Sequence, residues 1–455
     1  MSNYQKIFAG VLISVFLITS GLGCKQTSKE AAEKIQPVNL VYWRTQDGQD
    51  AFSSIIQNFR ANYPHISITY RVIRPEEYEQ ALLEAWAEDR GPDIFSIPNT
   101  WLGKYQTKIL PLALGSELSL GKKIIVGAIK KEEKIIIEKK IAPDLRQLKE
   151  IFVETVPRDM LIKNEIWGVP LSLDILTLYY NRDFLNNAGL ISPPRDWQEF
   201  VDDVKLLTLQ DRDGNFVQSG AALGAADNVD NLTDLLSLLM LQNGTSMVNE
   251  NGQATFNLAT KDDSSYFPGQ EAIKFYTSFS NPLQEIYSWN RQMPNSLESF
   301  IKGRVGFIFG YSDYLATIKA QAPKLNFDVA PVPQIKGSLQ EVNYAQYWLE
   351  TVSKKTKYPN EAWAFILFSA ETKNAKTFIE KTKRPTAHRE LIKQQLEDFD
   401  LSPFVKGVLT AKTWYKGKDY SLVKEAFQEM IKNVLSGEDI RKSIEYCVQK
   451  VNLSF

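Results

Sequence analysis

The sequence predicts an α/β protein that folds in water. Strand and helix patterns alternate between residues 38 and 97, an order typical of a parallel sheet covered by helices. The chain has 455 residues, of which 24% are charged and 44% hydrophobic. These values are close to the averages of globular proteins and exclude a polytopic membrane protein and a disordered chain. The length suffices for about two to four domains.

Each of the first elements follows from its apolar spacing. Strands are expected at residues 38–43, 66–72 and 94–97, and helices with one apolar face across 52–59 and 78–86. Because parallel sheets bind ligands at the carboxyl ends of their strands, the loops at 45–49 and 98–101 are candidate site loops.

The later elements are less regular. An apolar strand over 174–181 starts with a lone Asp174, further strands are expected at 305–309 and 327–332, and the chain from about residue 362 is mostly helical. Residues 121–140 are rich in Lys and Glu around short isoleucine runs. This segment is interpreted as a solvated insertion on a lobe edge, since lysines commonly protect strands from aggregation; contact with a membrane surface is the alternative.

The N-terminus has the pattern of an export signal. A short polar start with Lys6 precedes an apolar run over 7–18 and small residues up to Cys24. Residues 1–23 are therefore expected to be a lipoprotein signal peptide, Cys24 the acylated residue that anchors the protein to a membrane, and residues 24–36 a polar tether. An ordinary cleaved signal with an incidental Cys is the alternative. Cys447 lies in the apolar rhythm of a C-terminal helix and is expected to be a core residue.

The composition limits the chemistry. The chain has only 2 His and 2 Cys, and neither His65 nor His388 has a His or Cys at metal-ligand spacing, so no metal site is expected. No nucleophile elbow and no phosphate-binding glycine loop is found, so no cofactor is expected. The formal net charge of -1 offers no electrostatic footprint for nucleic acid.

Aromatic residues beside lone polar ones remain as candidates for a binding site. Indole and phenol rings stack on the apolar face of a sugar ring, and Asp, Asn, Gln or Arg can bracket its hydroxyls. The combination suits a carbohydrate ligand, whereas a Trp taken alone is more often a core residue than a sugar platform, so the alternative for each ring is packing. The candidate ligand-binding residues are Trp43, Gln46, Asp93, Asn99, Trp101, Asp174, Trp289, Tyr311, Trp348, Arg384, Trp414 and Tyr415.

Short motifs in a shared order carry a family resemblance. They are Val38-Asn39-Leu40-Val41-Tyr42-Trp43, Gly91-Pro92-Asp93-Ile94, Trp167-Gly168-Val169-Pro170, Phe300-Ile301-Lys302-Gly303-Arg304-Val305-Gly306-Phe307, Tyr347-Trp348-Leu349 and Asn360-Glu361-Ala362-Trp363. Their order over some 370 residues resembles that of the bacterial extracellular solute-binding lipoproteins of the carbohydrate-uptake type, the family of maltose-binding protein.

The resemblance implies a two-lobed periplasmic-binding-protein fold of type II, each lobe a mostly parallel sheet flanked by helices, with a cleft closed by hinge bending. The implied first lobe comprises residues 37–176 and 334–375, and the second 177–333 and 376–455.

The resemblance also implies roles. Asp93 and Asp174 are expected to accept sugar hydroxyls, Trp43 and Trp101 to line one wall, and Tyr311 and Trp414 to stack from the second lobe. The polar stretch 224–230 is expected near the cleft.

The predicted function is capture of a saccharide and its delivery to an ABC-transporter permease by a monomeric, lipid-anchored protein at the cell surface or periplasmic face of the membrane. Two alternatives stay open. One is a secreted glycosidase that uses paired carboxylates such as Asp93 and Asp174. The other is the same fold with a non-sugar ligand, for example a peptide, a polyamine or an opine.

Overall fold

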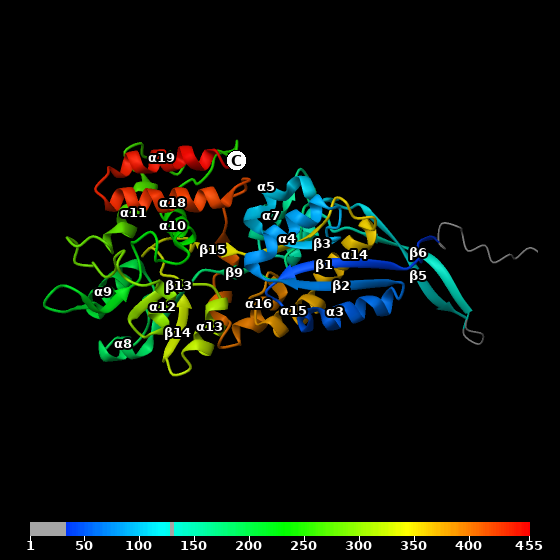
Figure 1. Ribbon diagram of the computed structural model, residues 1–455, viewed down its shortest axis with the longest axis horizontal. Helices are drawn as coiled ribbons and strands as arrows, with labels where there is room; N and C mark the ends of the chain where they lie inside the picture. Colours follow the sequence, from blue (N-terminus) through cyan, green and yellow to red (C-terminus); the bar gives the residue numbers. More distant parts are fainter. Residues whose placement is uncertain (1–32, 128–131) are drawn as a thin grey trace, which may run out of the picture.

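The computed structural model describes residues 33–127 and 132–455. The signal peptide, Cys24 and most of the tether lie outside the described residues. The described chain forms two lobes side by side, with β9 (Asp174–Ile175) and β15 (Asn343–Gln346) between them (Figure 1). In the part of the chain that the structure describes, every helix is too short or too polar to span a lipid bilayer.

The first lobe is built on a four-stranded sheet in the order β16-β3-β1-β2. Strand β1 (Val38–Thr45) pairs in parallel with β2 (Ile66–Ile73) and β3 (Ile94–Pro98), as the sequence predicts, while β16 (Trp348–Val352) runs antiparallel to β3. Helix α3 (Gln49–Asn62) buries Phe52, Ile55 and Phe59 completely. These residues share one helix face, which explains why α3 packs in the lobe core.

The other elements of the first lobe surround this sheet. They are α4 (Pro75–Ala87), η1 (Asn99–Trp101), α5 (Leu102–Tyr105), η2 (Gln106–Lys108), β4 (Leu112–Ala113), β5 (Glu117–Val126), β6 (Glu132–Ile141), α6 (Leu145–Ile151), α7 (Thr155–Met160), β7 (Leu161–Ile162), β8 (Glu165–Ile166), α14 (Pro359–Ser369), α15 (Thr372–Thr382) and α16 (Arg389–Leu396).

The Lys- and Glu-rich segment forms an antiparallel hairpin of β5 and β6 that projects from the first lobe (Figure 1). Its charges pair across the strands, with Lys122 Nζ 2.5 Å from Glu138 and Lys139 Nζ 3.1 Å from Glu117. Opposite charges on facing strands stabilise a ribbon of this kind.

The second lobe has a five-stranded sheet in the order β11-β12-β13-β10-β14. Its strands are β11 (Leu209–Gln210), β12 (Phe216–Ala221), β13 (Val305–Gly310), β10 (Thr177–Asn181) and β14 (Phe327–Pro331). Only β12 and β13 are parallel; β10 runs antiparallel to both its neighbours. The expectation of a mostly parallel sheet is therefore wrong for this lobe, because β10 enters it from the neighbouring β9 in the direction opposite to β13 and β14.

Helices and crossing segments complete the molecule. The helices of the second lobe are α8 (Arg182–Asn187), α9 (Trp197–Leu207), α10 (Leu232–Gln242), α11 (Pro268–Ser278), α12 (Ser296–Ile301), α13 (Asp313–Gln321), α18 (Tyr420–Leu435) and α19 (Ile440–Asn452). Between the lobes lie α17 (Ser402–Val405), η3 (Val408–Thr410) and β17 (Ala411–Lys412). Cys447 on α19 is 1% exposed in the second core, as predicted, and burial raises the pKa of its thiol.

The packing of α15 and α16 differs from the expected lobe boundary. Residues 376–455 are expected in the second lobe, but Phe378, Ile379 and Leu391 lie in the hydrophobic core of the first lobe. Phe404 of α17 packs in a smaller cluster with Tyr179 and Phe300 of the second lobe, whereas Val405, Val408 and Ala411 pack in the first core and Trp414 packs in the second. The chain therefore passes between the lobes over residues 404–414, and α15 stays with the first lobe because it packs against α3.

Candidate functional site

A cavity of about 470 Å³ lies between the two lobes. Residues from both cores line it, and so do the crossing strands β9 and β15. The lining residues are Gln46, Pro98, Asn99, Thr100, Trp101, Ser172, Asp174, Asp227, Val229, Asp230, Asn231, Leu232, Thr233, Asp234, Asp313, Tyr344, Ala345, Gln346, Tyr347, Trp348, Arg384, Tyr420, Lys424 and Gln428.

The first-lobe wall carries two half-buried indoles. Trp101 follows the carboxyl end of β3, and Trp348 opens β16 opposite Pro98 at the same edge of the sheet. The backbone N–H of Asn99 donates to the carbonyl of Tyr347 at 2.9 Å and holds the two chains together there. The antiparallel pairing of β16 with β3 therefore brings two aromatic rings from distant parts of the sequence to one wall.

Arg384 is the cation of this wall. Its Nε donates to Asp47 Oδ1 at 3.0 Å, and its Nη2 donates to Gln46 Oε1 at 3.0 Å. Asp47 is also 2.8 Å from Arg44 Nη1, and Arg44 Nε is 3.2 Å from Glu350 Oε1 inside the lobe. A line of ion pairs thus connects the first core to the cavity.

The second-lobe wall is formed by carboxylates and one face of α18. Asp234 accepts hydrogen bonds from Tyr420 Oη at 2.7 Å and Tyr311 Oη at 2.8 Å. Burial raises the pKa of Asp234, and these two hydrogen bonds offset only part of the effect. Lys424 lies 5.3 Å from the ring centre of Tyr420. This wall therefore presents several carboxylates and one ammonium group to the cavity, and both oxygens of Asp234 already accept hydrogen bonds within the protein.

Asp174 connects the crossing strand β9 to the second lobe. Its Oδ2 accepts from Ser312 N at 2.9 Å and from Ser312 Oγ at 2.5 Å, and its Oδ1 accepts from Ile175 N at 3.0 Å. Burial raises the pKa of Asp174 to about 7, although the hydrogen bonds from Ser312 lower it. Both carboxylate oxygens thus already have partners within the protein.

The cavity contains half of the twelve residues predicted to bind ligand. These are Gln46, Asn99, Trp101, Asp174, Trp348 and Arg384. Asp227 and Asp230 of the polar stretch 224–230 also line it, as expected. The two predicted site loops reach it through Gln46 and through residues 98–101.

Three of the other predicted residues have structural contacts within their own lobes. Trp43 is 7% exposed in the first core, with the guanidinium of Arg71 4.8 Å from its ring centre. Asp93 accepts from Val41 N at 2.9 Å and Thr356 Oγ1 at 2.6 Å. Trp289 is completely buried. None of the three lines the cavity, because each side chain points into its own lobe.

Tyr311, Trp414 and Tyr415 also differ from expectation. Tyr311 is 1% exposed and reaches the site only by donating to Asp234. Trp414 donates from Nε1 to Ser237 Oγ at 2.9 Å inside the second core. Tyr415 donates to the carbonyl of Ser454 at 3.2 Å. Tertiary packing covers all three rings.

The sequence contained a signal for part of the missed wall. Tyr420, Lys424 and Gln428 all line the cavity and are spaced four residues apart on α18, so they share one helix face. Asp230 and Asp234 have the same spacing. The spacing on α18 predicts a common face but not which neighbour that face meets, so Tyr420, Lys424, Gln428 and Asp234 are absent from the predicted site, whereas Asp230 belongs to the polar stretch expected near the cleft.

Within residues 33–127 and 132–455, no three or more His, Cys, Asp or Glu side chains are grouped so that they could hold a metal ion. His388 is completely buried, and burial lowers its pKa to about 4, so its imidazole is neutral at pH 7.

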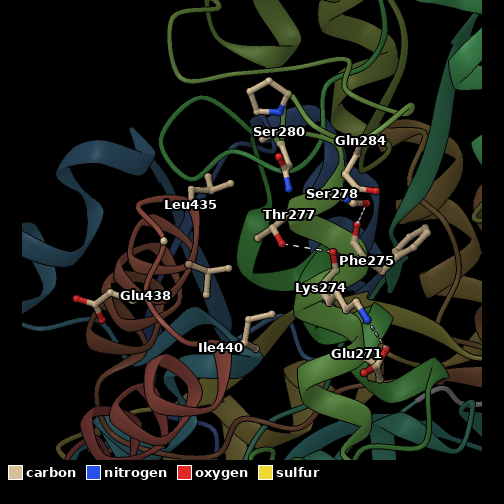
Figure 2. Close-up of a pocket in the computed structure, with 14 residues that line it drawn as sticks. Glu271, Lys274, Phe275, Thr277, Ser278, Ser280, Gln284, Leu435, Glu438 and Ile440 are labelled. Carbon is tan, nitrogen blue, oxygen red and sulfur yellow. Dashed lines mark hydrogen bonds and ion pairs between the residues drawn. The ribbon is translucent and has the colours of Figure 1, made fainter.

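A second hollow of about 740 Å³ lies on the second lobe between α11 and the end of α18 (Figure 2). Its hydroxyls are used locally: Thr277 Oγ1 donates to Ile273 O at 2.9 Å and Ser278 Oγ to Phe275 O at 2.6 Å. Lys274 lies beside Glu271 at 4.0 Å. The hydroxyls of Thr277 and Ser278 are therefore directed to their own helix, and Ser280 Oγ donates to Leu223 O at 3.3 Å. We assign the functional site to the interlobe cavity.

Comparison with known proteins agrees with this architecture. Residues 43–376 match the model of the family described as bacterial extracellular solute-binding protein. A binding protein of Brucella abortus (strain 2308) is 28% identical over 188 residues, 40% of this chain and 41% of the relative. The maltodextrin-binding protein MdxE of Bacillus subtilis (strain 168) is 24% identical over 238 residues, 51% of this chain and 52% of the relative. The chain thus spans between two fifths and about half of the length of these relatives.

Solved structures share the fold over nearly the whole chain. The cyclic alpha-maltosyl-1,6-maltose binding protein of Arthrobacter globiformis aligns with a TM-score of 0.70 at 19% identity, covering 92% of this chain and 99% of that one. The maltose complex of MalE from Listeria monocytogenes aligns with a TM-score of 0.68 at 17% identity, covering 91% and 97%. The family model covers most of the sequence and the fold agrees, and the chain therefore belongs to the bacterial extracellular solute-binding protein family.

Proposed function

We propose that the protein captures a saccharide in the interlobe cavity and delivers it to the permease of an ABC transporter. The observation that carries the proposal is the composition of the two walls. Half-buried Trp101 and Trp348 offer apolar faces on one side, and Asp230, Asp234 and their neighbours offer acceptors on the other. A sugar ring has a C–H face and a rim of hydroxyls that match these two surfaces.

Similar proteins support this ligand class. MdxE is named as a maltodextrin-binding protein, and solved structures of the same fold are titled as complexes with maltotetraose, mannobiose and tagatose. Binding would stabilise a closed form through contacts that both lobes make with the ligand. The permease would recognise that form.

Asp93 and Asp174, the two carboxylates named for a glycosidase, do not share the cavity, because only Asp174 lines it. Asp93 lies outside the cavity, where both its oxygens accept hydrogen bonds from Val41 and Thr356. Family membership also places the chain among binding proteins.

The test is a binding panel read by intrinsic tryptophan fluorescence and calorimetry. It contains maltose, maltotetraose, mannobiose and tagatose, with spermidine and a tetrapeptide as non-sugar solutes. We expect at least one saccharide to bind and no reducing ends to be released. Binding of spermidine or the peptide alone would overturn the saccharide assignment.

Variants test whether binding occurs at the proposed wall. Trp348→Ala and Trp101→Ala are expected to weaken saccharide binding at least tenfold, about 1.4 kcal/mol. Trp167→Ala is the matched control, because Trp167 is half-buried in the same lobe but does not line the cavity. Equal losses in all three variants would contradict the site.

We further propose that Cys24 is acylated and tethers a monomeric protein to the outer face of the membrane. The family is extracellular, which implies export. Mass spectrometry of the protein from its native membrane should show a lipid-modified Cys24 at the N-terminus. A Cys24→Ala variant should be released from the membrane, and an unmodified, membrane-free wild type would contradict the anchor.

A further inference from the structure

Four charged side chains form a line from the interior of the first lobe to the cavity. Glu350 and Arg44 are 2% and 3% exposed, Asp47 is 7% exposed, and Arg384 at the cavity is 20% exposed. Successive members are separated by 3.2, 2.8 and 3.0 Å. Buried charges require partners of this kind because desolvation without them is costly.

Asp47 lies between the two guanidinium groups. Its Oδ2 faces Arg44 and its Oδ1 accepts from Arg384 Nε. Arg44 is itself held by Glu350, whose other oxygen accepts from Tyr42 Oη at 2.5 Å. Arg44, which is held by Glu350 inside the lobe, therefore fixes the orientation of the Asp47 carboxylate.

This arrangement leaves the Nη1 group of Arg384 available to a ligand. Nε is bonded to Asp47 and Nη2 to Gln46 Oε1, and Nη1 donates to no group within residues 33–127 and 132–455. Gln46 itself lies in the left-handed region at φ 70°, a conformation uncommon for a non-glycine residue. It places the amide at the cavity, where it accepts from Arg384.

The charges surrounding Arg384 define the ligand group it can take. The four residues of the line sum to zero charge, and Arg384 also lowers the pKa of Asp313 and Asp174, whose pKa values burial raises. An anionic ligand group would meet these carboxylates. Neutral oxygens avoid that repulsion, and a planar guanidinium suits two adjacent acceptors.

We propose that Asp47 is a positioning residue that orients Arg384 so that its free Nη1 group binds neighbouring hydroxyl oxygens of a neutral saccharide. The ligand part of this inference rests on the proposed function; the positioning part does not. Asp47 acts through Arg384 and does not itself line the cavity.

The positioning is tested without ligand by NMR of protein labelled with ¹⁵N-arginine. The Nε–H signal of Arg384 is assigned by its loss in Arg384→Gln. In Asp47→Asn its exchange with water should be at least tenfold faster than in the wild type, because the charged acceptor is removed. Asp50→Asn is the matched control: Asp50 is an exposed first-turn residue of α3, and this variant should leave the signal unchanged.

The effect on binding is tested by a double-mutant cycle with maltotetraose, or with mannobiose if that ligand binds more tightly in the panel. Asp47→Asn and Arg384→Gln should each raise the Kd for the saccharide at least tenfold. The Kd of the double variant should be at most threefold higher than that of the single variant with the higher Kd. Non-additivity of this kind indicates that two residues act as one unit.

Each outcome decides the proposal. Unchanged Nε–H exchange in Asp47→Asn, or additive losses in the cycle, would overturn the positioning role. If Asp47→Asn does not fold, Arg384→Gln leaves the pairing of Arg44 with Asp47 and Glu350 in place, and normal saccharide binding by that variant would overturn the inference. If no saccharide binds the wild type, the proposed function and the ligand part fail together, and the exchange experiment still decides the positioning part.

Discussion

The indole of Trp414 packs inside the second lobe, 4% exposed, with its ring stacked on Phe427 at a centroid distance of 6.2 Å. Removing a buried indole costs transfer free energy and leaves a cavity. We therefore expect Trp414→Ala to lower the free energy of unfolding by about 3–5 kcal/mol. Urea denaturation measures the loss. Saccharide affinity of the folded protein should change little, in contrast to Trp348→Ala, so a binding defect at unchanged stability would contradict the packing role.

Asp174 should make stability depend on pH. Its pKa is about 7 in the folded protein against about 3.9 in an unfolded chain. Between these values the folded state binds the extra proton, so the contribution of Asp174 to stability falls as pH rises from about 4 to 7 and stays low above that range. Asp174→Asn removes this titration.

The measurement is the melting temperature of the wild type and Asp174→Asn at several pH values from 4 to 8. The difference between them should grow in favour of the variant as pH rises. Asp203→Asn is the control. Burial raises the pKa of Asp203 to about 6, and this carboxyl does not line the cavity. Parallel pH profiles of wild type and Asp174→Asn would contradict the assignment.

At the scale of elements, residues 411–418, which lead from the first core into the second lobe, contact α7 and α5 of the first lobe. Asp159 on α7 accepts from Tyr347 Oη at 2.7 Å and Thr413 Oγ1 at 2.6 Å. On α5, Gly103 lies so close to the segment that an added Cβ would be 2.3 Å from Gly417 O and 2.7 Å from Lys416 O. The backbone approach there requires a residue without a side chain.

Gly103→Ala tests this contact between elements. Helix propensity alone would make the change stabilising, by about 1 kcal/mol. We expect instead a lower melting temperature and a larger radius of gyration in small-angle X-ray scattering, because the methyl group pushes the backbone of residues 416–417 away. Lys104→Ala on the same helix is the control. A melting temperature equal to or above that of the wild type would show that residues 416–417 can move away from the methyl group without loss of stability.

Elements also differ in how far local sequence specifies them. The strands and helices from 38 to 98 are predicted correctly because each has its own apolar period. The direction of β10 against β13 and β14 depends on pairings more than a hundred residues apart, which no local pattern records. The same holds for α15 and α16, whose apolar faces fit either lobe until the cores are formed.

At the scale of the whole molecule, the site exists only because three chain crossings bring two lobes together. Gln46, Asp174 and Arg384 are separated by more than a hundred residues from one another and line one cavity. Composition and the strand-end rule predicted aromatic and polar residues at loops. They could not separate Trp348 from Trp43 or Trp289, since all three stand beside polar residues in sequence and differ only in what packs over them.

Apolar periodicity, motif order and side-chain composition are local properties, and for this reason the sequence predicts the α/β class, the family and half of the residues that line the interlobe cavity. Three features follow from the folded molecule and not from local sequence: which indoles reach the cavity, which lobe α15 and α16 pack against, and the ion pair of Asp47 with Arg384. Burial and ion pairing depend on neighbours from distant segments, because these segments meet only when the cores and the crossings between them have formed.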